Sequence, residues 1–301
     1  MPEVFFQGQS VYELACGSSR VLLAPGYGAR LLKWTIGEQE IIHWPEDANW
    51  ANEYSVAHTR GGNPILFPFI ARHYGNGVLG EWRDNAGTVR ELPMHGFARD
   101  MPFEVVEATS GVLRMRLTPT TATRAMYPFE FIFDVVYELK DNTLQATFET
   151  TNAGKAPLPY YAGHHFYFSI PHAERMDWNI ILPCARWGLQ EKDGTVNFYA
   201  ATKTEFDLDD TDLMDRFHLD FSDSRVLLKH RLSHRQIAIE LPCEYSVPWY
   251  DVTTWTASPE ADFFCVEPWL GLPDAIHSGH GLRWLEAGQT EKAVCIIAAS
   301  E

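Results

Sequence analysis

The chain contains 301 residues, of which 46% are hydrophobic and 21% are charged, a composition typical of a globular protein. Its 24 Lys and Arg residues against 40 Asp and Glu residues give a formal net charge of −16 at pH 7. This acidic balance argues against binding to nucleic acid or to an anionic membrane surface, because both depend on basic residues that neutralise phosphates.

The chain shows no targeting or membrane signal. No apolar run approaches the roughly 18 residues of a transmembrane helix, and the N-terminal stretch lacks the basic and apolar regions of a signal peptide. The cysteines are odd in number and widely spaced, at positions 16, 184, 243, 265 and 295. We therefore expect reduced thiols in a cytoplasmic protein. We also expect a monomer or a weak homodimer.

Alternation of apolar and polar residues predicts strands along most of the chain. Residues 112–118 alternate with period two, and 130–150 is predicted to be a β-hairpin that turns at 140–142. Only 208–218 offers a turn or two of helix. Further strands are expected at 11–15, 20–24, 103–108, 235–241 and 292–298. The pattern predicts an all-β, antiparallel sandwich or barrel-like architecture, with residues 1–301 as a single domain.

Two glycine-containing segments carry basic side chains among aromatic residues. In 59–68, Gly-Gly before Asn-Pro permits a tight turn beside a ligand, although Arg60 taken alone is most simply a solvated arginine. In 94–99, an extended chain would place His95, Phe97 and Arg99 on one face, which would suit a polyhydroxyl or anionic ligand. A structural histidine at position 95 explains that segment equally well.

A third segment contains two adjacent histidines. Period-two geometry over 162–169 places His164 on the same face as Phe166 and Phe168, which is typical of a core face. His165 falls on the opposite, more polar face and is the better candidate for catalysis. A shift of one residue or a bulge would reverse this choice.

The fourth segment, 263–273, is apolar and contains one acid, Glu267. An isolated carboxylate in such a run must be hydrogen-bonded, paired, or shifted in pKa. Glu267 is therefore a candidate functional acid, with a buried structural ion pair as the alternative.

No motif predicts a metal or a cofactor. The spacings of His230 with His234 and of His277 with His280 suit a metal, but no cysteine or carboxylate nearby completes either set. We therefore expect neither a metal nor a cofactor. The acidic stretch 205–215 is most simply a solvated loop from which one acid could reach a site.

Taken in order, these segments resemble the aldose 1-epimerase (galactose mutarotase) family, and most of all its glucose-6-phosphate 1-epimerase branch. The matching stretches are Arg60-Gly-Gly-Asn-Pro-Ile-Leu-Phe-Pro68, His95-Gly-Phe-Ala-Arg99, His165-Phe-Tyr-Phe168 and Cys265-Val-Glu-Pro-Trp269. The resemblance implies a β-supersandwich fold and an isomerase that interconverts the α and β anomers of an aldohexose, such as a hexose 6-phosphate.

The resemblance also implies roles for individual residues. Glu267 matches the general base that acts on the anomeric hydroxyl, and His165 matches the general acid that acts on the ring oxygen. His95 matches a residue that binds near the ring oxygen. Arg60 and Arg99 are implied to bind phosphate. Asp215 matches an aspartate near the ring, whereas Arg72, Arg83 and Arg90 match no motif of the family.

Two other functions compete with this hypothesis. A mutarotase for unphosphorylated aldoses would use Arg60 and Arg99 for hydroxyl groups or for structure. A non-catalytic carbohydrate-binding sandwich would need the aromatic surface but no proton-transfer pair. A glycoside hydrolase ranks below both, because that chemistry uses two carboxylates that flank the bond and the marked segments offer one.

Overall fold

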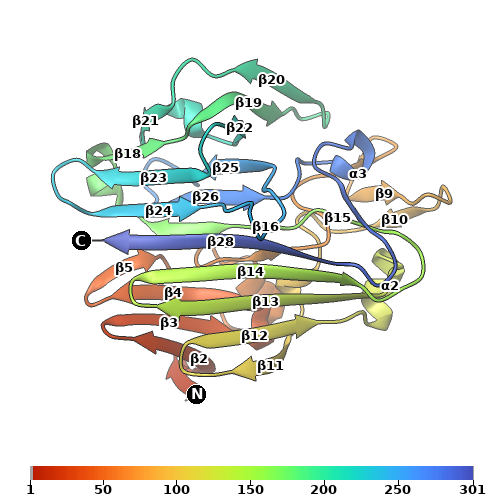
Figure 1. The fold of residues 1–301 in the computed structure, drawn as a ribbon, viewed down its shortest axis with the longest axis horizontal. Coiled ribbons are helices and arrows are strands. Elements are labelled where there is room, and N and C mark those ends of the chain that lie inside the picture. The colour runs from red at the N-terminus through yellow and green to blue at the C-terminus, as the bar shows by residue number, and fades with distance from the viewer. Residues whose placement is uncertain (1–2, 301) are drawn as a thin grey trace.

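The computed structural model describes residues 3–300, and two large antiparallel sheets pack face to face within this range. Sheet I has thirteen strands and sheet II has nine among the described residues. Figure 1 shows the long strands of sheet II running side by side across the molecule, with the small helices α2 and α3 at one end.

One half of sheet I consists of N-terminal strands, and the other half consists of strands from the second half of the chain. In spatial order it contains β1 (Glu3–Phe6), β2 (Gln9–Cys16), β3 (Ser19–Ala24), β4 (Arg30–Ile36), β5 (Gln39–Ile42), β17 (Phe166–Ser169), β26 (Phe263–Trp269), β25 (Asp251–Trp255), β22 (Arg216–Phe221), β19 (Cys184–Gln190) and β20 (Val196–Ala200). Two short strands join beside β26, namely β6 (Ile65–Leu66) and β16 (Gly163–His164).

Sheet II covers one face of sheet I. In spatial order it contains β11 (Glu104–Ala108), β12 (Val112–Leu117), β13 (Phe131–Lys140), β14 (Thr143–Asn152), β28 (Thr290–Ser300), β24 (Gln236–Glu240), β23 (Arg225–His230), β18 (Trp178–Ile181) and β21 (Glu205–Asp207). The pairing of β14 with the C-terminal strand β28 joins the middle of the chain to its end.

Short elements cap the ends of the two sheets. The small strands are β7 (Tyr74–Gly75), β8 (Val78–Leu79), β9 (Glu81–Arg83), β10 (Val89–Glu91), β15 (Leu158–Tyr160) and β27 (Arg283–Leu285). The helices are α1 (Glu53–Ala57), α2 (Thr121–Met126) and α3 (Ala275–Ser278), with 3-10 helices η1 (Pro25–Tyr27), η2 (Ala98–Asp100), η3 (His172–Asp177) and η4 (Thr211–Leu213). None of the helices within residues 3–300 has the length and apolar character needed to cross a membrane.

The strands expected from period-two alternation are confirmed. The predicted hairpin forms β13 and β14. Along β13 buried residues alternate with more exposed ones at every position except Asp134, which is also buried. Within 208–218 the only helical structure is the single turn η4, and β22 begins at Arg216. Alternation predicts these strands correctly because each sheet buries one of its faces against the other sheet.

The core between the sheets is rich in aromatic rings. Phe67 stacks on Phe133 with ring centroids 4.1 Å apart and meets Phe97 and Tyr127 edge to face. All four side chains are buried. Because each buried ring removes a large apolar area from water, this cluster supplies a rigid support for the loops around it.

Candidate active site

A cavity of about 460 Å³ opens on the face of sheet I that is turned away from sheet II. Alternation along β25 and β26 creates this division, because Val252 and Val266 enter the core between the sheets while Thr253 and Glu267 face the cavity. Its volume suits a small-molecule ligand. The cavity is lined by all six residues predicted for the site: Arg60, His95, Arg99, His165, Asp215 and Glu267.

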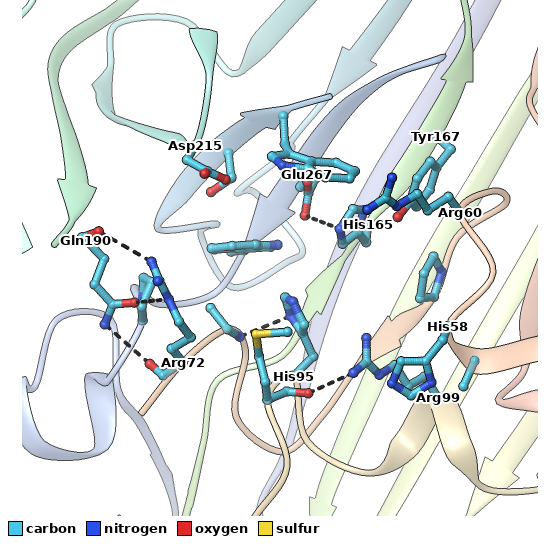
Figure 2. A pocket seen from close by; sticks show the side chains of 18 of the residues that line it. His58, Arg60, Arg72, His95, Arg99, His165, Tyr167, Gln190, Asp215 and Glu267 are labelled. Carbon is cyan, nitrogen blue, oxygen red and sulfur yellow. Dashed lines mark hydrogen bonds and ion pairs between the residues drawn. The ribbon is translucent and has the colours of Figure 1, made fainter. Parts of the chain in front are cut away.

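Glu267 lies in the middle of the cavity wall. It is 1% exposed, and its Oε2 lies 3.5 Å from Nε2 of His165 (Figure 2). Within residues 3–300 that oxygen has no hydrogen-bond partner. Burial raises the pKa of Glu267 well above its ordinary value, and the nearby carboxyls of Asp215 and Asp251 raise it further. The side chain therefore favours its protonated form.

His165 is held in place through its backbone. It lies between β16 and β17, where its amide donates to Oδ1 of Asn63 at 2.8 Å. Asn63 is fully buried, and its Nδ2 contacts the hydroxyl of Tyr137 at 2.8 Å and Nδ1 of His164 at 2.9 Å. One asparagine thus fixes both histidines of the double motif and turns them to opposite sides.

The two histidines occupy the faces that alternation predicts. His164 is buried in the core and stacks on Phe148 and Phe166, with ring centroids 4.0 and 4.7 Å apart. His165 stacks on Tyr167 at 4.8 Å on the cavity side. Burial lowers the pKa of His165 to about 3, and the positive charges of Arg30 and Arg99 add to this effect.

His95 faces the cavity as a neutral hydrogen-bond donor. Its Nδ1 accepts the amide of Ala71 at 3.1 Å, which leaves the ring proton on Nε2. Burial lowers the pKa of His95 well below its ordinary value, and Arg99 lowers it further. The ring can therefore donate a hydrogen bond to a ligand oxygen without carrying a charge.

The segment 94–99 is not extended, so the predicted common face of His95, Phe97 and Arg99 is wrong. His95 has a φ of 70° and Gly96 has a φ of 73°, after which the chain enters η2. A side chain at Gly96 would meet the carbonyl oxygen of Phe67 at 2.1 Å. The turn sends Phe97 into the core and leaves the two basic residues at the cavity.

One end of the cavity is basic. His58 and Arg60 follow α1, which contacts η2, and η2 carries Arg99 (Figure 2). The guanidinium of Arg60 lies over the ring of Trp255 at 5.7 Å. Nη2 of Arg99 donates to the carbonyl of Met94 at 3.0 Å.

A buried arginine shapes the loop that carries Arg60. Arg30 is 1% exposed and donates to the carbonyl oxygens of Ala57, Thr59 and Gly61 at 3.2, 2.5 and 2.6 Å. Next to this loop, a side chain at Gly62 would meet the carbonyl oxygen of Leu31 at 2.0 Å. The loop is thus fastened to β4 from both sides.

The opposite end of the cavity combines an arginine with an acid. Arg72 donates through Nε to Oε1 of Gln190 at 3.1 Å, and Asp215 stands at the rim with a φ of 53° (Figure 2). Loss of hydration raises the pKa of Asp215, while Arg72 counteracts the shift. Sheet I thus presents the pair of His165 and Glu267 between this end and the basic end.

Three donor atoms, two of them from the pair itself, have a spacing that a metal ion could use. The ligand atoms of His165, Cys265 and Glu267 lie within 4.8 Å of one another. Burial raises the pKa of the Cys265 thiol well above its ordinary value, as it does for Glu267. A metal ion would therefore have to displace two tightly held protons.

The sequence profile of the aldose 1-epimerase family matches residues 10–298. The chain belongs to the aldose 1-epimerase family. It is 24% identical to the LacX protein of Lactococcus lactis over 239 residues, which cover 74% of this chain and 78% of LacX. It is 28% identical to an Escherichia coli K12 protein provisionally named a glucose-6-phosphate 1-epimerase, over 42% of this chain and 40% of that protein.

Solved structures of this epimerase family share the fold. The structure of a galactose mutarotase related enzyme from Lactobacillus acidophilus superimposes with a TM-score of 0.81 at 23% identity, covering 97% of both chains. The predicted all-β, galactose mutarotase-like supersandwich is therefore confirmed.

Some residues of this epimerase family member escaped the sequence analysis. Arg72 lines the cavity although it matched no motif, whereas Arg83, which bonds to Asn76, and Arg90, which bonds to Asp84, are not among its lining residues. Asn63 stood in a recognised motif, but nothing in the pattern showed what it would bind. Asp251, 1% exposed and bonded to the hydroxyl of Thr253 at 2.9 Å, gave no signal in the sequence.

Proposed function

We propose that this protein interconverts the α and β anomers of a hexose 6-phosphate. The observation that carries the proposal is a carboxyl–imidazole pair, Glu267 and His165, beside a basic end of the same cavity. The pair supplies two proton-transfer groups, and the basic end supplies two guanidinium groups for a phosphate.

The chemistry needs one proton removed and one proton delivered. Glu267 takes the proton of the anomeric hydroxyl while His165 gives a proton to the ring oxygen, and the bond between C1 and the ring oxygen breaks. The resulting aldehyde turns about the C1–C2 bond and recloses from its other face, with both protons returned. His95, as a neutral donor, holds an oxygen of the ring in place.

The phosphate assignment is supported by the arginines. Arg60 stands over an aromatic ring, and Arg99 has only a 3.8 Å contact with Asp100 as its ion pair among residues 3–300. Guanidinium groups bind phosphate in a bidentate manner, which makes arginine better suited than lysine to this task. The relative provisionally named a glucose-6-phosphate 1-epimerase supports the same substrate class.

The test is the rate of anomer exchange measured by magnetisation-transfer NMR. Wild-type protein should accelerate the exchange of glucose 6-phosphate more than that of glucose. Glu267→Gln and His165→Asn should each lower turnover by a factor of about 10²–10⁴, because each removes one proton-transfer group. Neither variant should have a thermal midpoint far below that of the wild type.

Other outcomes select other functions. Acceleration of glucose or galactose without a preference for the phosphosugar would favour a mutarotase for unphosphorylated aldoses. Binding of sugars without any acceleration would favour a carbohydrate-binding sandwich. Collapse of the fold in both variants would show that the pair is structural.

A further inference from the structure

Two arginines set the electrostatic surroundings of His165. Arg30 is buried, and the three groups to which it donates are neutral carbonyls. Arg99 has a buried Nε without a hydrogen-bond partner among residues 3–300, and its contact with Asp100 is long. Both charges act on His165. The carboxyl that interacts with both arginines is Asp100, and because burial raises its pKa it offsets their charges only in part.

These surroundings leave the pair in the opposite state from the one that catalysis requires. Burial is the largest cause that disfavours a protonated His165 and an ionised Glu267. The charges of Arg30 and Arg99 act in the same direction on His165, and those of Asp215 and Asp251 do so on Glu267. Burial and charge together therefore favour a pair in which Glu267 carries the proton. The proposed reaction begins with that proton on His165, which requires a transfer between two atoms 3.5 Å apart.

We propose that an oxyanion held by Arg60 and Arg99 moves this proton from Glu267 to His165 and so switches the pair into its working form. The proposal rests on the proposed function, which places the substrate's phosphate between these arginines. The transfer breaks the O–H bond of the carboxyl and forms an N–H bond on the imidazole, so that the total charge of the pair stays the same. An anion lowers the energy of the new imidazolium because it offsets the arginine charges.

The charged and titratable groups that face His165 come from five parts of the chain. They are Glu267 and Cys265 on β26, Tyr167 on β17, Arg30 on β4, His95 and Arg99 on the segment 94–99, and Arg60 after α1. Burial raises the pKa of both Cys265 and Tyr167 and lowers that of His95, so these three are neutral. The arginines are therefore the charges that a bound anion would offset.

In this proposal the phosphate group both binds the substrate to the arginines and activates the pair of Glu267 and His165. An anion that is not attached to the sugar should then accelerate the exchange of plain glucose. Inorganic sulfate is the appropriate probe, because it is a dianion at pH 7 but too weak a base to catalyse mutarotation by itself as phosphate buffer does. Each unit by which it raises the pKa of His165 makes the working form tenfold more populated.

The experiment measures glucose exchange by magnetisation-transfer NMR with increasing sodium sulfate, against sodium chloride at the same ionic strength. The chloride series removes the effect of screening on the arginines. Saturating sulfate should raise the rate constant with glucose about tenfold or more, and sulfate should compete with glucose 6-phosphate. Arg60→Met should lose the response to sulfate, whereas Arg225→Ala, which removes an exposed arginine outside the cavity, should keep it.

A second readout follows the proton itself. The ¹⁵N chemical shifts of the His165 ring, assigned by comparison with His165→Asn, should move toward those of an imidazolium when sulfate is added. A purely structural effect of the anion would leave them unchanged.

Separate results overturn the switch and the proposed function. If sulfate competes with glucose 6-phosphate but leaves the glucose rate and the His165 shifts as they are in chloride, the switch is wrong and the phosphate site stands. If sulfate does not bind, no oxyanion is held by these arginines and the switch is wrong. If glucose 6-phosphate is exchanged no faster than glucose, the proposed substrate is wrong.

Discussion

Asn63 and His165 are separated by 102 residues in the chain and joined by one short hydrogen bond, from the amide of His165 to Oδ1 of Asn63 at 2.8 Å. The same side chain contacts Tyr137 and His164, so that all of its polar atoms are used. Asn63 is thus a positioning residue for the catalytic candidate. It acts through the backbone and leaves the imidazole free.

Asn63→Ala should destabilise the protein by about 2–4 kcal/mol, because it leaves a buried amide and a buried hydroxyl without partners. Turnover should fall as well, since His165 loses its anchor. Unfolding in urea and anomer exchange measure the two effects. Asn197→Ala serves as the control, since the Asn197 side chain bonds among residues 3–300 only to Glu191 at the surface. The stability of this variant should stay within about 0.5 kcal/mol of wild type. Equal stability of the two variants would contradict the role of Asn63.

Arg60→Ala and Arg99→Ala should each raise the KM for glucose 6-phosphate about 10–100-fold. Each removes a charge-assisted hydrogen bond worth roughly 1.5–3 kcal/mol, and 1.4 kcal/mol corresponds to a factor of ten. The KM for glucose should change far less, because glucose presents no anion. Steady-state kinetics with both sugars decide the matter, and equal losses with the two substrates would exclude a phosphate role.

Asp251→Asn should make the protein more stable than the wild type as the pH rises. Burial raises the pKa of Asp251 well above its ordinary value, so the folded state binds this proton more tightly than the unfolded state does. The contribution of Asp251 to the unfolding free energy is fully present below the ordinary aspartate pKa. It is lost as the pH rises through the pKa that Asp251 has in the folded state. The amide cannot ionise and still accepts from Thr253.

Urea unfolding of the wild type and of Asp251→Asn between pH 4 and pH 8 tests this linkage. The difference in unfolding free energy should grow in favour of the variant by at most about 1.4 kcal/mol per pH unit. A difference that is independent of pH would mean that Asp251 titrates normally. Glu267→Gln should show a trend of the same sign, because burial also raises the pKa of Glu267.

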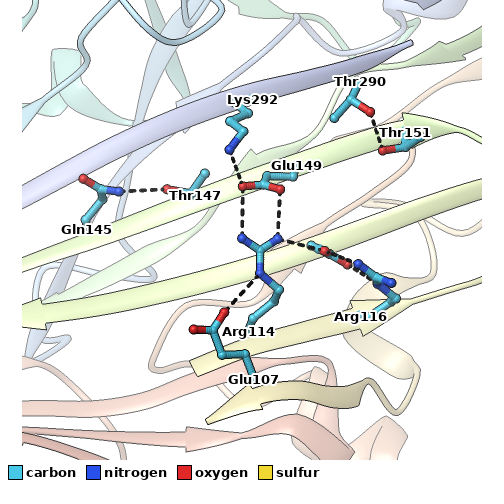
Figure 3. Close-up of polar contacts among 10 residues, drawn as sticks. Glu107, Arg114, Arg116, Gln145, Thr147, Glu149, Thr151, Thr290 and Lys292 are labelled. Carbon is cyan, nitrogen blue, oxygen red and sulfur yellow. Dashed lines mark hydrogen bonds and ion pairs between the residues drawn. The ribbon is translucent and has the colours of Figure 1, made fainter. Parts of the chain in front are cut away.

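Asp134→Ala should destabilise the protein by about 2–3 kcal/mol without changing anomer exchange. Asp134 is 3% exposed and accepts from Arg114 at 2.9 Å and from Arg116 at 2.7 and 2.8 Å. Figure 3 shows Arg114 bridging onward to Glu149, which also binds Lys292. Removing the central acid leaves two guanidinium groups short of a partner.

Lys292→Ala is the matched control for this ion-pair network, because its side chain is 55% exposed and its bond to Glu149 faces solvent. It should cost about 1 kcal/mol or less. Thermal unfolding with and without added salt separates the two variants. A loss of activity in Asp134→Ala at temperatures where it remains folded would contradict the separation of this network from the cavity.

Much of this protein could be predicted before its three-dimensional structure. The hairpin of β13 and β14 and the opposite faces of His164 and His165 follow from alternation, because a strand with one buried face imposes a period of two on its sequence. Glu267 could be recognised as exceptional because an acid in an apolar run must be hydrogen-bonded, paired or shifted in pKa.

Other features depend on where the chain folds back on itself. The segment 94–99 looked extended, but contact between the backbones at Gly96 and Phe67 imposes a left-handed turn that separates Phe97 from its basic neighbours. The bond from Asn63 to His165, the clamp of Arg30 on the loop of Arg60, and the acids around Glu267 all join residues far apart in sequence. The sequence by itself determined the strands, their faces and the candidate residues, because these depend on local periodicity and residue type. Only the tertiary structure decided how the pKa values of His165 and Glu267 are shifted, because charge and burial act through space and depend on distances that a linear pattern does not contain.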